Sequence, residues 1–177
     1  MNAAAVAAVA AVACVRLGEL WLARRNTAAL LAAGAVERGS GHYPAIVAVH
    51  ASWLAAIAIF VPDTASVSWP LIGVFLGLQC LRVWVLASLG RFWTTRIITL
   101  PGAPLIRRGP YRYVRHPNYL LVAAEIAVLP LAFGAWAIAL IFSALNAGVL
   151  AWRIRLENEA LADRLGGGTH QPLTTLR

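Results

Sequence analysis

The segment 109–119, with the sequence GPYRYVRHPNY, places basic, aromatic and histidine side chains directly before an apolar stretch. Pro117 favours extended backbone at His116 and is tolerated in the first turn of a helix, so we expect His116 at a helix start. Free backbone N–H groups and the positive end of the helix dipole favour a carboxylate or phosphate ligand there. On its residues alone, the segment is also explained as a basic loop that contacts anionic lipid headgroups.

A second polar cluster lies further along the chain, from Arg153 to Leu165. Apolar residues at positions 154, 161 and 165 predict an amphipathic helix. Arg153 and Glu157 are four residues apart and therefore share one face of that helix. Without further context, this spacing predicts an ordinary surface ion pair worth about 0.3–0.5 kcal/mol.

Four polar side chains interrupt apolar stretches of the chain: His50, Gln79, Arg82 and Glu125. A charged group inside a membrane costs about 2.5–3.5 kcal/mol on insertion scales, so it has to be paired or to line a polar cavity. Glu125 and Arg82 fit either a structural ion pair or a substrate-facing pocket, and His50 fits a satisfied buried imidazole. In a pocket, Glu125 would be the candidate catalytic base, because a carboxylate shielded from water can take up a proton.

The elements that position these residues are predicted to be membrane-spanning helices. The 177 residues are 60% hydrophobic and only 12% charged, and the mean hydropathy is +0.72. A soluble domain of this size needs more polar surface, so the apolar excess is expected to face lipid. We therefore predict an all-α integral membrane protein with about five transmembrane helices, a cytoplasmic cofactor-binding loop and a C-terminal amphipathic helix. The five predicted spans are residues 3–22, 44–61, 71–89, 119–133 and 135–152.

Arginine placement predicts the orientation of these spans. All fifteen basic residues are arginine: three lie in the linker 23–43, six in the linker 90–118 and four from Arg153 onward. The other side of a five-span path carries Asp63 and no arginine. By the positive-inside rule, the N-terminus lies outside and the large loop and C-terminus lie in the cytoplasm. The arginines cluster between apolar segments and form no basic stripe, which excludes nucleic acid as a partner. No metal-ligand spacing is present.

The chain is expected to form one domain, 1–165, followed by a flexible tail, 166–177, that starts at a run of three glycines. Its alanine-rich composition and its exclusive use of arginine are typical of a GC-rich bacterial genome. These features predict a protein of the bacterial inner membrane.

The motif at 109–119, followed after two spans by the sequence RIRLENEAL at 153–161, resembles the isoprenylcysteine carboxyl methyltransferase family. The wider membrane phospholipid methyltransferases share this layout, and the resemblance covers roughly residues 71–165. The family's tail often has two adjacent glutamates, whereas here Asn158 occupies the second position.

This resemblance implies binding of S-adenosyl-L-methionine in a cytoplasmic pocket and a lipophilic acceptor that enters from the membrane lipids. It places Arg153 near the acceptor and Glu157 at a polar end of the cofactor. With Glu125 as a base, Glu125 and Arg153 are the catalytic candidates. The other implied cofactor-binding residues are Leu105, Ile106, Tyr111, His116, Pro117, Asn118 and Tyr119.

The acceptor is predicted from a narrower resemblance. A bacterial branch of the family that is similar in its RHPNY and ENE residues is thought to O-methylate alkylpyrones or alkylresorcinols, which are long-chain polyketides. An enzyme that makes such lipids or polyketides is then an expected partner. Three alternatives remain: a carboxyl or phospholipid methyltransferase, a non-enzymatic scaffold whose loop binds anionic lipid, and a small transporter that uses Arg82 and Glu125.

Overall fold

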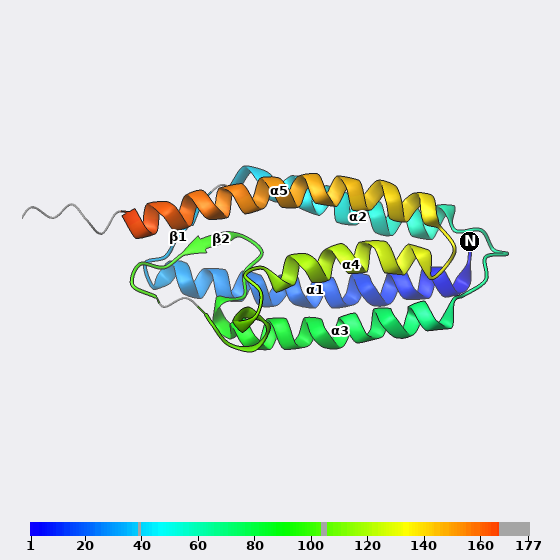
Figure 1. Cartoon of the computed structure of the whole chain (residues 1–177), viewed down its shortest axis with the longest axis horizontal. Coiled ribbons are helices and arrows are strands. Elements are labelled where there is room, and N and C mark those ends of the chain that lie inside the picture. The colour runs from blue at the N-terminus through cyan, green and yellow to red at the C-terminus, as the bar shows by residue number, and fades with distance from the viewer. Residues whose placement is uncertain (39, 104–105, 167–177) are drawn as a thin grey trace, which may run out of the picture.

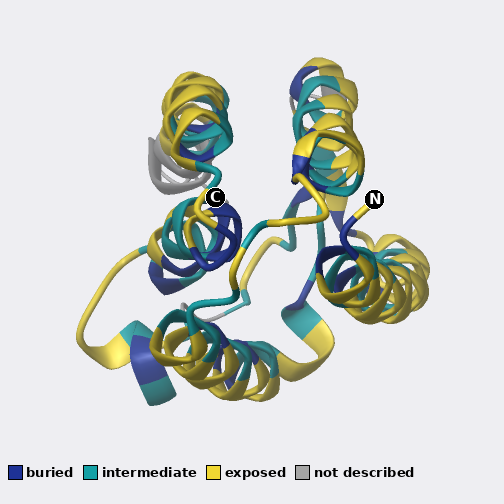
Figure 2. Cartoon of the chain, turned by 90° about the vertical axis from the view of Figure 1, so that its right-hand side faces the viewer, coloured by how far each residue is buried: buried dark blue, intermediate teal, exposed yellow. Residues whose placement is uncertain are grey.

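The computed structural model describes residues 1–38, 40–103 and 106–166, and it is an all-α membrane protein built on five long helices (Figure 1). Exposed residues cover the outer faces of these helices (Figure 2), as expected for surfaces that face lipid. The helices are α1 (Ala3–Ala32), α2 (Tyr43–Phe60), α3 (Trp69–Leu89), α4 (Pro117–Leu131) and α5 (Trp136–Gly166).

Four of the helices, α1, α2, α3 and α5, are long and apolar enough to cross a membrane. The fourth predicted span, 119–133, is the shorter helix α4, whose 15 residues cover about 22 Å of a hydrocarbon core of about 30 Å. Pro130 lies inside its last turn, and Gly134 has φ 69° in the turn that follows. Because α4 packs against both α3 and α5, its short apolar length is enclosed by neighbouring helices.

Two helices extend beyond the predicted spans. The first span was predicted as residues 3–22, and α1 continues to Ala32, since arginine favours helix and Arg24 and Arg25 do not end it. The predicted C-terminal amphipathic helix follows the predicted span 135–152 without a break, so that both belong to α5, one helix about 46 Å long. Of the expected tail, Gly166 ends α5 and 167–177 lie outside the described residues.

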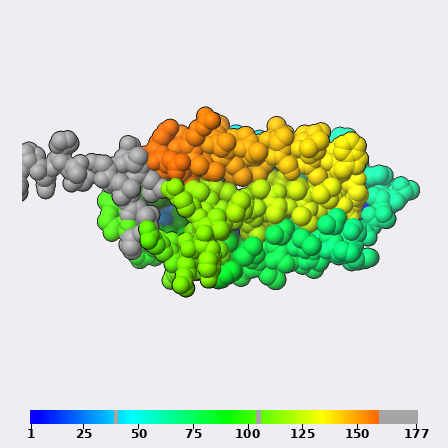
Figure 3. All heavy atoms as spheres, in the orientation of Figure 1, coloured from blue at the N-terminus to red at the C-terminus, as the bar shows by residue number. Residues whose placement is uncertain are grey.

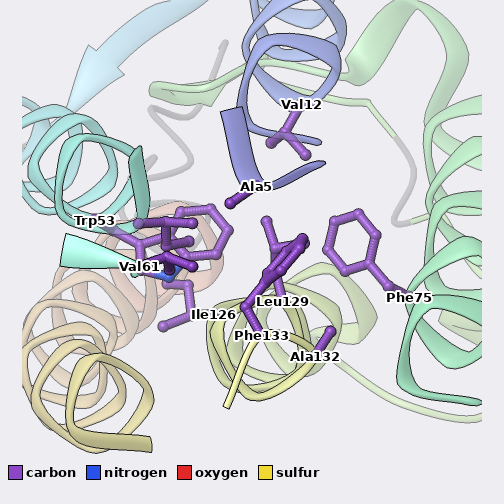
Figure 4. Close-up of a cluster of buried hydrophobic side chains, with 10 residues drawn as sticks. Ala5, Val12, Trp53, Val61, Phe75, Ile126, Leu129, Ala132 and Phe133 are labelled. Atoms are coloured by element: carbon purple, nitrogen blue, oxygen red, sulfur yellow. The ribbon is translucent and has the colours of Figure 1, made fainter. Parts of the chain in front are cut away.

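The core lies between α1, α2, α3 and α4 in the half of the molecule that contains the N-terminus (Figure 4). Trp53, Ile57, Phe75, Ile126 and Leu129 are buried there. The same half is closed by polar contacts of the N-terminal residues: the Asn2 side chain donates to the backbone carbonyls of Pro62 and Ala65 and accepts from the backbone N–H of Ala5.

The opposite half carries the irregular elements (Figure 1). Strands β1 (Val36–Arg38) and β2 (Ile97–Thr99) form a two-stranded antiparallel sheet in which Glu37 lies opposite Ile98. The 3-10 helices η2 (Gly90–Phe92) and η3 (Gly109–Arg112) flank β2 in sequence. These short elements and the 3-10 helix η1 (Ser40–His42) connect the ends of the long helices, and η2, β2 and η3 line the cavities described next.

Candidate functional site

A cavity of about 910 Å³, here called the large compartment, lies at this irregular end of the helices. Figure 3 views the molecule with that end at the left, where the yellow-green loop lies below the orange end of α5. The described lining residues are Leu30, Leu89, Phe92, Ile98, Thr99, Leu100, Ala103, Ile106, Arg107, Tyr111, Arg112, Arg115 and His116.

A second cavity of about 270 Å³, the small compartment, adjoins the first. The two share seven lining residues, among them Phe92, Tyr111 and His116. The volume of the small compartment is below the range of about 300–1,000 Å³ that is typical for drug-sized ligands. A ligand of that size would therefore extend into the large compartment.

A network of polar side chains lines the small compartment. The Tyr119 hydroxyl donates to Glu157 Oε1, and Arg153 Nε donates to the same hydroxyl oxygen at 2.7 Å. Arg153 Nε lies 3.3 Å from Glu157 Oε1, and its Nη1 donates to the Thr95 carbonyl at 2.7 Å. His116 Nδ1 is 3.5 Å from Glu157 Oε2, and the His116 ring stacks on Tyr119 at a centroid distance of 5.1 Å.

Two helices position this network. His116 stands immediately before α4 and Tyr119 lies in its first turn, as Pro117 predicted, while Arg153 and Glu157 lie one turn apart on α5. The expected i,i+4 pair of Arg153 and Glu157 therefore forms, but it is not an isolated surface pair. Both side chains are largely buried, with exposed fractions of 11% and 19%, because α4 and α5 pack together.

Tyr111 reaches both compartments from η3, and the position of η3 depends on Gly109. Gly109 has φ 56°, and a Cβ there would meet Ser88 Oγ at 2.0 Å. Arg108 Nε also donates to the Ser88 carbonyl at 2.7 Å, so η3 is fixed against α3. Burial, and to a lesser degree the nearby Glu157 charge, raise the pKa of Tyr111 above its usual value, so this phenol stays protonated near neutral pH.

The structure brings most of the sequence-predicted binding residues together. Ile106 lines the large compartment, Tyr111 and His116 line both, and Asn118, Tyr119, Arg153 and Glu157 line the small one. Pro117 is buried in α4 and lines neither compartment. Leu105 lies outside the described residues.

Glu125 does not line either compartment. It is 1% exposed and is surrounded by donors: Gln79 Nε2 at 2.7 Å and Arg82 Nε at 2.9 Å from Oε1, and Arg16 Nη2 at 2.6 Å from Oε2. Arg82 Nη2 also donates to Oε2, and Arg82 Nη1 lies 3.3 Å from Glu19 Oε2. This arrangement is the structural ion pair, one of the two alternatives for Glu125 and Arg82, enlarged by Arg16 and Glu19 of α1.

Several lining residues were missed in the sequence. Phe92, Trp93, Ile98 and Thr99 belong to η2, β2 and the residues next to them. Strands of three residues carry no clear alternation, and an aromatic residue at the end of a predicted span is equally typical of a membrane interface. Leu30 was missed because residues 23–43 were interpreted as a linker.

The site fits a ligand that carries groups of both charges. Arg107, Arg112 and Arg115 line the large compartment, whose described lining includes no carboxylate, while the small compartment contains Glu157. Asn118 Oδ1 is buried without a hydrogen-bond partner in the described part of the chain, and a buried unpaired acceptor costs about 1–3 kcal/mol. The described residues form no cluster of metal-ligating side chains.

Fold and site together define an integral membrane protein with a ligand-sized cavity, lined by apolar and charged side chains, at one end of its helices. Residues 71–163 match the family described as isoprenylcysteine carboxyl methyltransferase (ICMT). The chain belongs to this family, and its class is therefore that of a membrane methyltransferase. The match covers α3, α4 and most of α5, which carry the network of His116, Tyr119, Arg153 and Glu157.

Two bacterial relatives match over nearly the whole chain. The protein described as "Uncharacterized protein YpbQ" of Bacillus subtilis (strain 168) is 37% identical over 152 residues, which cover 84% of this chain and 90% of that protein. A protein of Haemophilus influenzae, described only as uncharacterized, is 27% identical over 159 residues, covering 86% and 92% respectively. No solved structure matches the chain.

Proposed function

We propose that this membrane methyltransferase uses S-adenosyl-L-methionine to O-methylate a lipophilic acceptor. The network of His116, Tyr119, Arg153 and Glu157 supports the proposal, because it lines a compartment that opens into a larger, mostly apolar one. A methyl-transfer site needs two ligands held in line, and two adjoining compartments meet that need.

The small compartment is the proposed location of the donor's polar groups. When bound, S-adenosyl-L-methionine supplies a methyl group activated by a sulfonium. Glu157 is placed to accept hydrogen bonds from an ammonium group, and the start of α4 favours a carboxylate. Asn118 Oδ1 offers an acceptor to a donor group of the ligand. Tyr119 and Arg153 fix the Glu157 carboxylate, so its orientation is set before a ligand arrives.

The large compartment is the proposed acceptor site. Apolar side chains such as Leu30, Leu89, Phe92 and Ile106 suit a hydrocarbon chain, and three arginines suit an acidic or strongly polar head. We favour a long-chain alkylpyrone or alkylresorcinol, whose acidic enol or phenol oxygen would take the methyl group. The alternatives are a carboxylate of the isoprenylcysteine type and a phospholipid.

Glu125 is not proposed as the base for this reaction, although its type and depth suggested that role. Its two oxygens already accept four hydrogen bonds, and it lines neither compartment. We propose instead that Glu125 joins α1, α3 and α4. A methyl transfer to a carboxylate needs no base. A phenol or enol first has to release its proton to water, and the arginines that line the large compartment would hold the resulting anion.

The decisive experiment measures S-adenosyl-L-methionine binding to the purified protein in detergent by calorimetry. Glu157→Ala and His116→Ala are expected to abolish measurable binding, while Glu159→Ala, an exposed change two residues further along α5, leaves it unchanged. Equal affinity in all three variants would refute the site. Mass spectrometry after incubation of membranes with labelled donor and lipid extract then distinguishes a methyl ether from a methyl ester.

The same experiment distinguishes the non-enzymatic alternative. A scaffold whose basic loop binds anionic lipid would bind anionic vesicles, with affinity that falls as salt rises, and would show no binding of the methyl donor. The six arginines between α3 and α4 make such vesicle binding expected in either case, so the donor measurement decides between them.

A further inference from the structure

One irregular segment, from Gly90 to Arg96, forms a wall shared by the two compartments. Phe92 borders both, and Trp93, Thr94 and Arg96 border the small one. The segment runs through η2 and ends just before β2, so no hydrogen-bond ladder of a long helix holds its backbone. Gly90 has φ 54°, and its carbonyl accepts from the Trp93 backbone N–H at 3.0 Å. The position of this wall therefore depends on contacts from outside the segment.

One of these contacts comes from α1. The Asn26 side-chain Nδ2 donates to the Gly90 carbonyl at 3.1 Å and to the Trp93 carbonyl at 2.9 Å. These two carbonyls bracket η2 and with it Phe92. A single amide nitrogen uses both of its hydrogens, so Asn26 fixes the distance between the two ends of this turn. Asn26 lies outside the residues 71–163 that match the family.

A second contact comes from α5. Arg153 Nη1 donates to the Thr95 carbonyl at 2.7 Å, and the same guanidinium contacts Tyr119 and Glu157 through Nε. The wall is thus held from two sides, by Asn26 at its first half and by Arg153 at its second. Arg153 joins it directly to the network that lines the small compartment.

We propose that Asn26 is a positioning residue of the binding site: it holds the wall 90–96 so that Phe92 and Trp93 keep the shape of the compartments. Trp93 is 5% exposed, so its ring is packed and moves only together with the backbone that Asn26 holds. This inference rests on the proposed function for its ligand. It assigns α1 a part in the site, in addition to crossing the membrane and contributing Leu30 to the lining.

The test compares Asn26→Asp and Asn26→Ala with the wild-type protein. Aspartate has the same shape but, when ionised, donates no hydrogen bond and places negative charge against two carbonyl oxygens. The matched control is Thr27→Ala, the next residue of α1, which is similarly half-buried. For each protein, S-adenosyl-L-methionine affinity is measured by calorimetry in detergent, and thermal unfolding and limited proteolysis near Arg91 and Arg96 are followed without ligand.

Donor affinity is expected to fall about tenfold in Asn26→Ala and further in Asn26→Asp, the loss expected for two hydrogen bonds. Cleavage at Arg91 or Arg96 is expected to become faster in both, while Thr27→Ala matches the wild type. A merely structural Asn26 would lower the unfolding temperature and leave donor affinity at the wild-type value, which would overturn the inference. Absence of donor binding by the wild type would instead refute the proposed function.

A double-mutant cycle with Arg153→Lys adds an independent readout. Two side chains that hold one wall should be coupled, so the effects of Asn26→Ala and Arg153→Lys on donor affinity should not add. Additive effects would show that Asn26 and Arg153 act separately, and they too would contradict a shared wall.

Discussion

At the scale of single residues, the Tyr119 hydroxyl is a group whose removal should weaken binding of the methyl donor. It donates to Glu157 and accepts from Arg153, so it connects the charged residues of α5 to the first turn of α4. In Tyr119→Phe the Glu157 carboxylate loses one fixed donor and the ring remains stacked on His116. We expect donor affinity to fall about three- to tenfold, the typical net effect of losing one hydrogen bond.

Calorimetry in detergent measures this change, with Tyr113→Phe as the control. Tyr113 lies in the same loop, but it is 76% exposed and lines neither compartment. A Tyr119→Phe protein that binds the donor as well as the control would show that the hydroxyl does not organise the site.

Gly109 lies so close to Ser88 that a side chain at this position would collide with it. Gly109→Ala forces a left-handed residue to carry a Cβ that would lie 2.0 Å from Ser88 Oγ and 2.9 Å from Ser88 Cβ. Backbone strain of about 1–2 kcal/mol adds to overpacking of about 1–3 kcal/mol. We therefore expect Gly109→Ala to lower the unfolding temperature and to displace Tyr111 from both compartments.

Gly102→Ala provides the matched comparison, because Gly102 has φ 74° in the same loop and nothing within 4 Å of its added Cβ. Gly102→Ala therefore adds backbone strain but no steric clash, so we expect it to lower the stability less than Gly109→Ala. Equal losses in the two alanine variants would mean that contact with Ser88 does not position η3.

At the scale of the helices, a group of buried charged side chains holds α1, α3 and α4 together. Glu125 and Arg82 have exposed side-chain fractions of 1% and 4%, and Arg16 and Glu19 complete a neutral group of two cations and two anions. When the Glu125 charge is removed, Arg16 and Arg82 keep their positive charges in a buried place with one counter-charge fewer. We expect Glu125→Gln to destabilise the folded protein by about 3–5 kcal/mol, the usual effect of breaking a buried pair.

Unfolding in detergent–denaturant mixtures measures this loss, and Glu37→Gln serves as the control. Glu37 pairs with Arg96 at 2.9 Å on an exposed surface, where a pair contributes at most about 1 kcal/mol. A Glu125→Gln protein as stable as Glu37→Gln, with methyl transfer lost, would return Glu125 to a catalytic role.

The same elements show what the sequence could predict. The spans 44–61 and 71–89 agree with α2 and α3 to within two residues, because Pro44 and Pro70 begin them and apolar residues fill them. The pairing of Arg82 with Glu125 was one of two alternatives, which could be named because few polar residues lie in these spans. Arg16 and Glu19 lie near the end of the predicted span 3–22, and only the tertiary arrangement brings Arg16 to Glu125 and Glu19 to Arg82.

The candidate site divides in the same way. The family resemblance implied His116, Asn118, Tyr119, Arg153 and Glu157 as site residues, and all five line the small compartment. Local patterns by themselves predicted only a helix start at His116 and a shared helix face for Arg153 and Glu157. Phe92, Trp93 and Ile98 were not predicted, because their contribution depends on a wall whose backbone is held by tertiary contacts. Such contacts join residues far apart in the sequence, 67 positions for Asn26 and Trp93, and no local pattern reports them.

On the scale of the whole molecule, the two ends differ in charge, and that difference predicts the orientation. The end with the compartments carries the arginines of the linkers and of α5, whereas the loop between α2 and α3 carries Asp63, which contacts the N-terminal ammonium group at 2.6 Å. By the positive-inside rule, we expect the compartments to open to the cytoplasm and Asp63 to face outside. A cytoplasmic site also suits a donor made in the cytoplasm.

Cysteine labelling of intact cells tests this orientation. In a Cys14→Ser, Cys80→Ser background, Asp63→Cys should react with a membrane-impermeant maleimide from outside, and Tyr113→Cys, 76% exposed in wild type, only after the membrane is opened. Both positions lie in loops, so their different reactivity would reflect the side of the membrane and not burial. Labelling of Tyr113→Cys in intact cells would reverse the orientation, because the compartments, Arg112 and Arg115 lie on the same side as Tyr113. The site would then be separated from the cytoplasmic donor, and the proposed methyl transfer would lose its source.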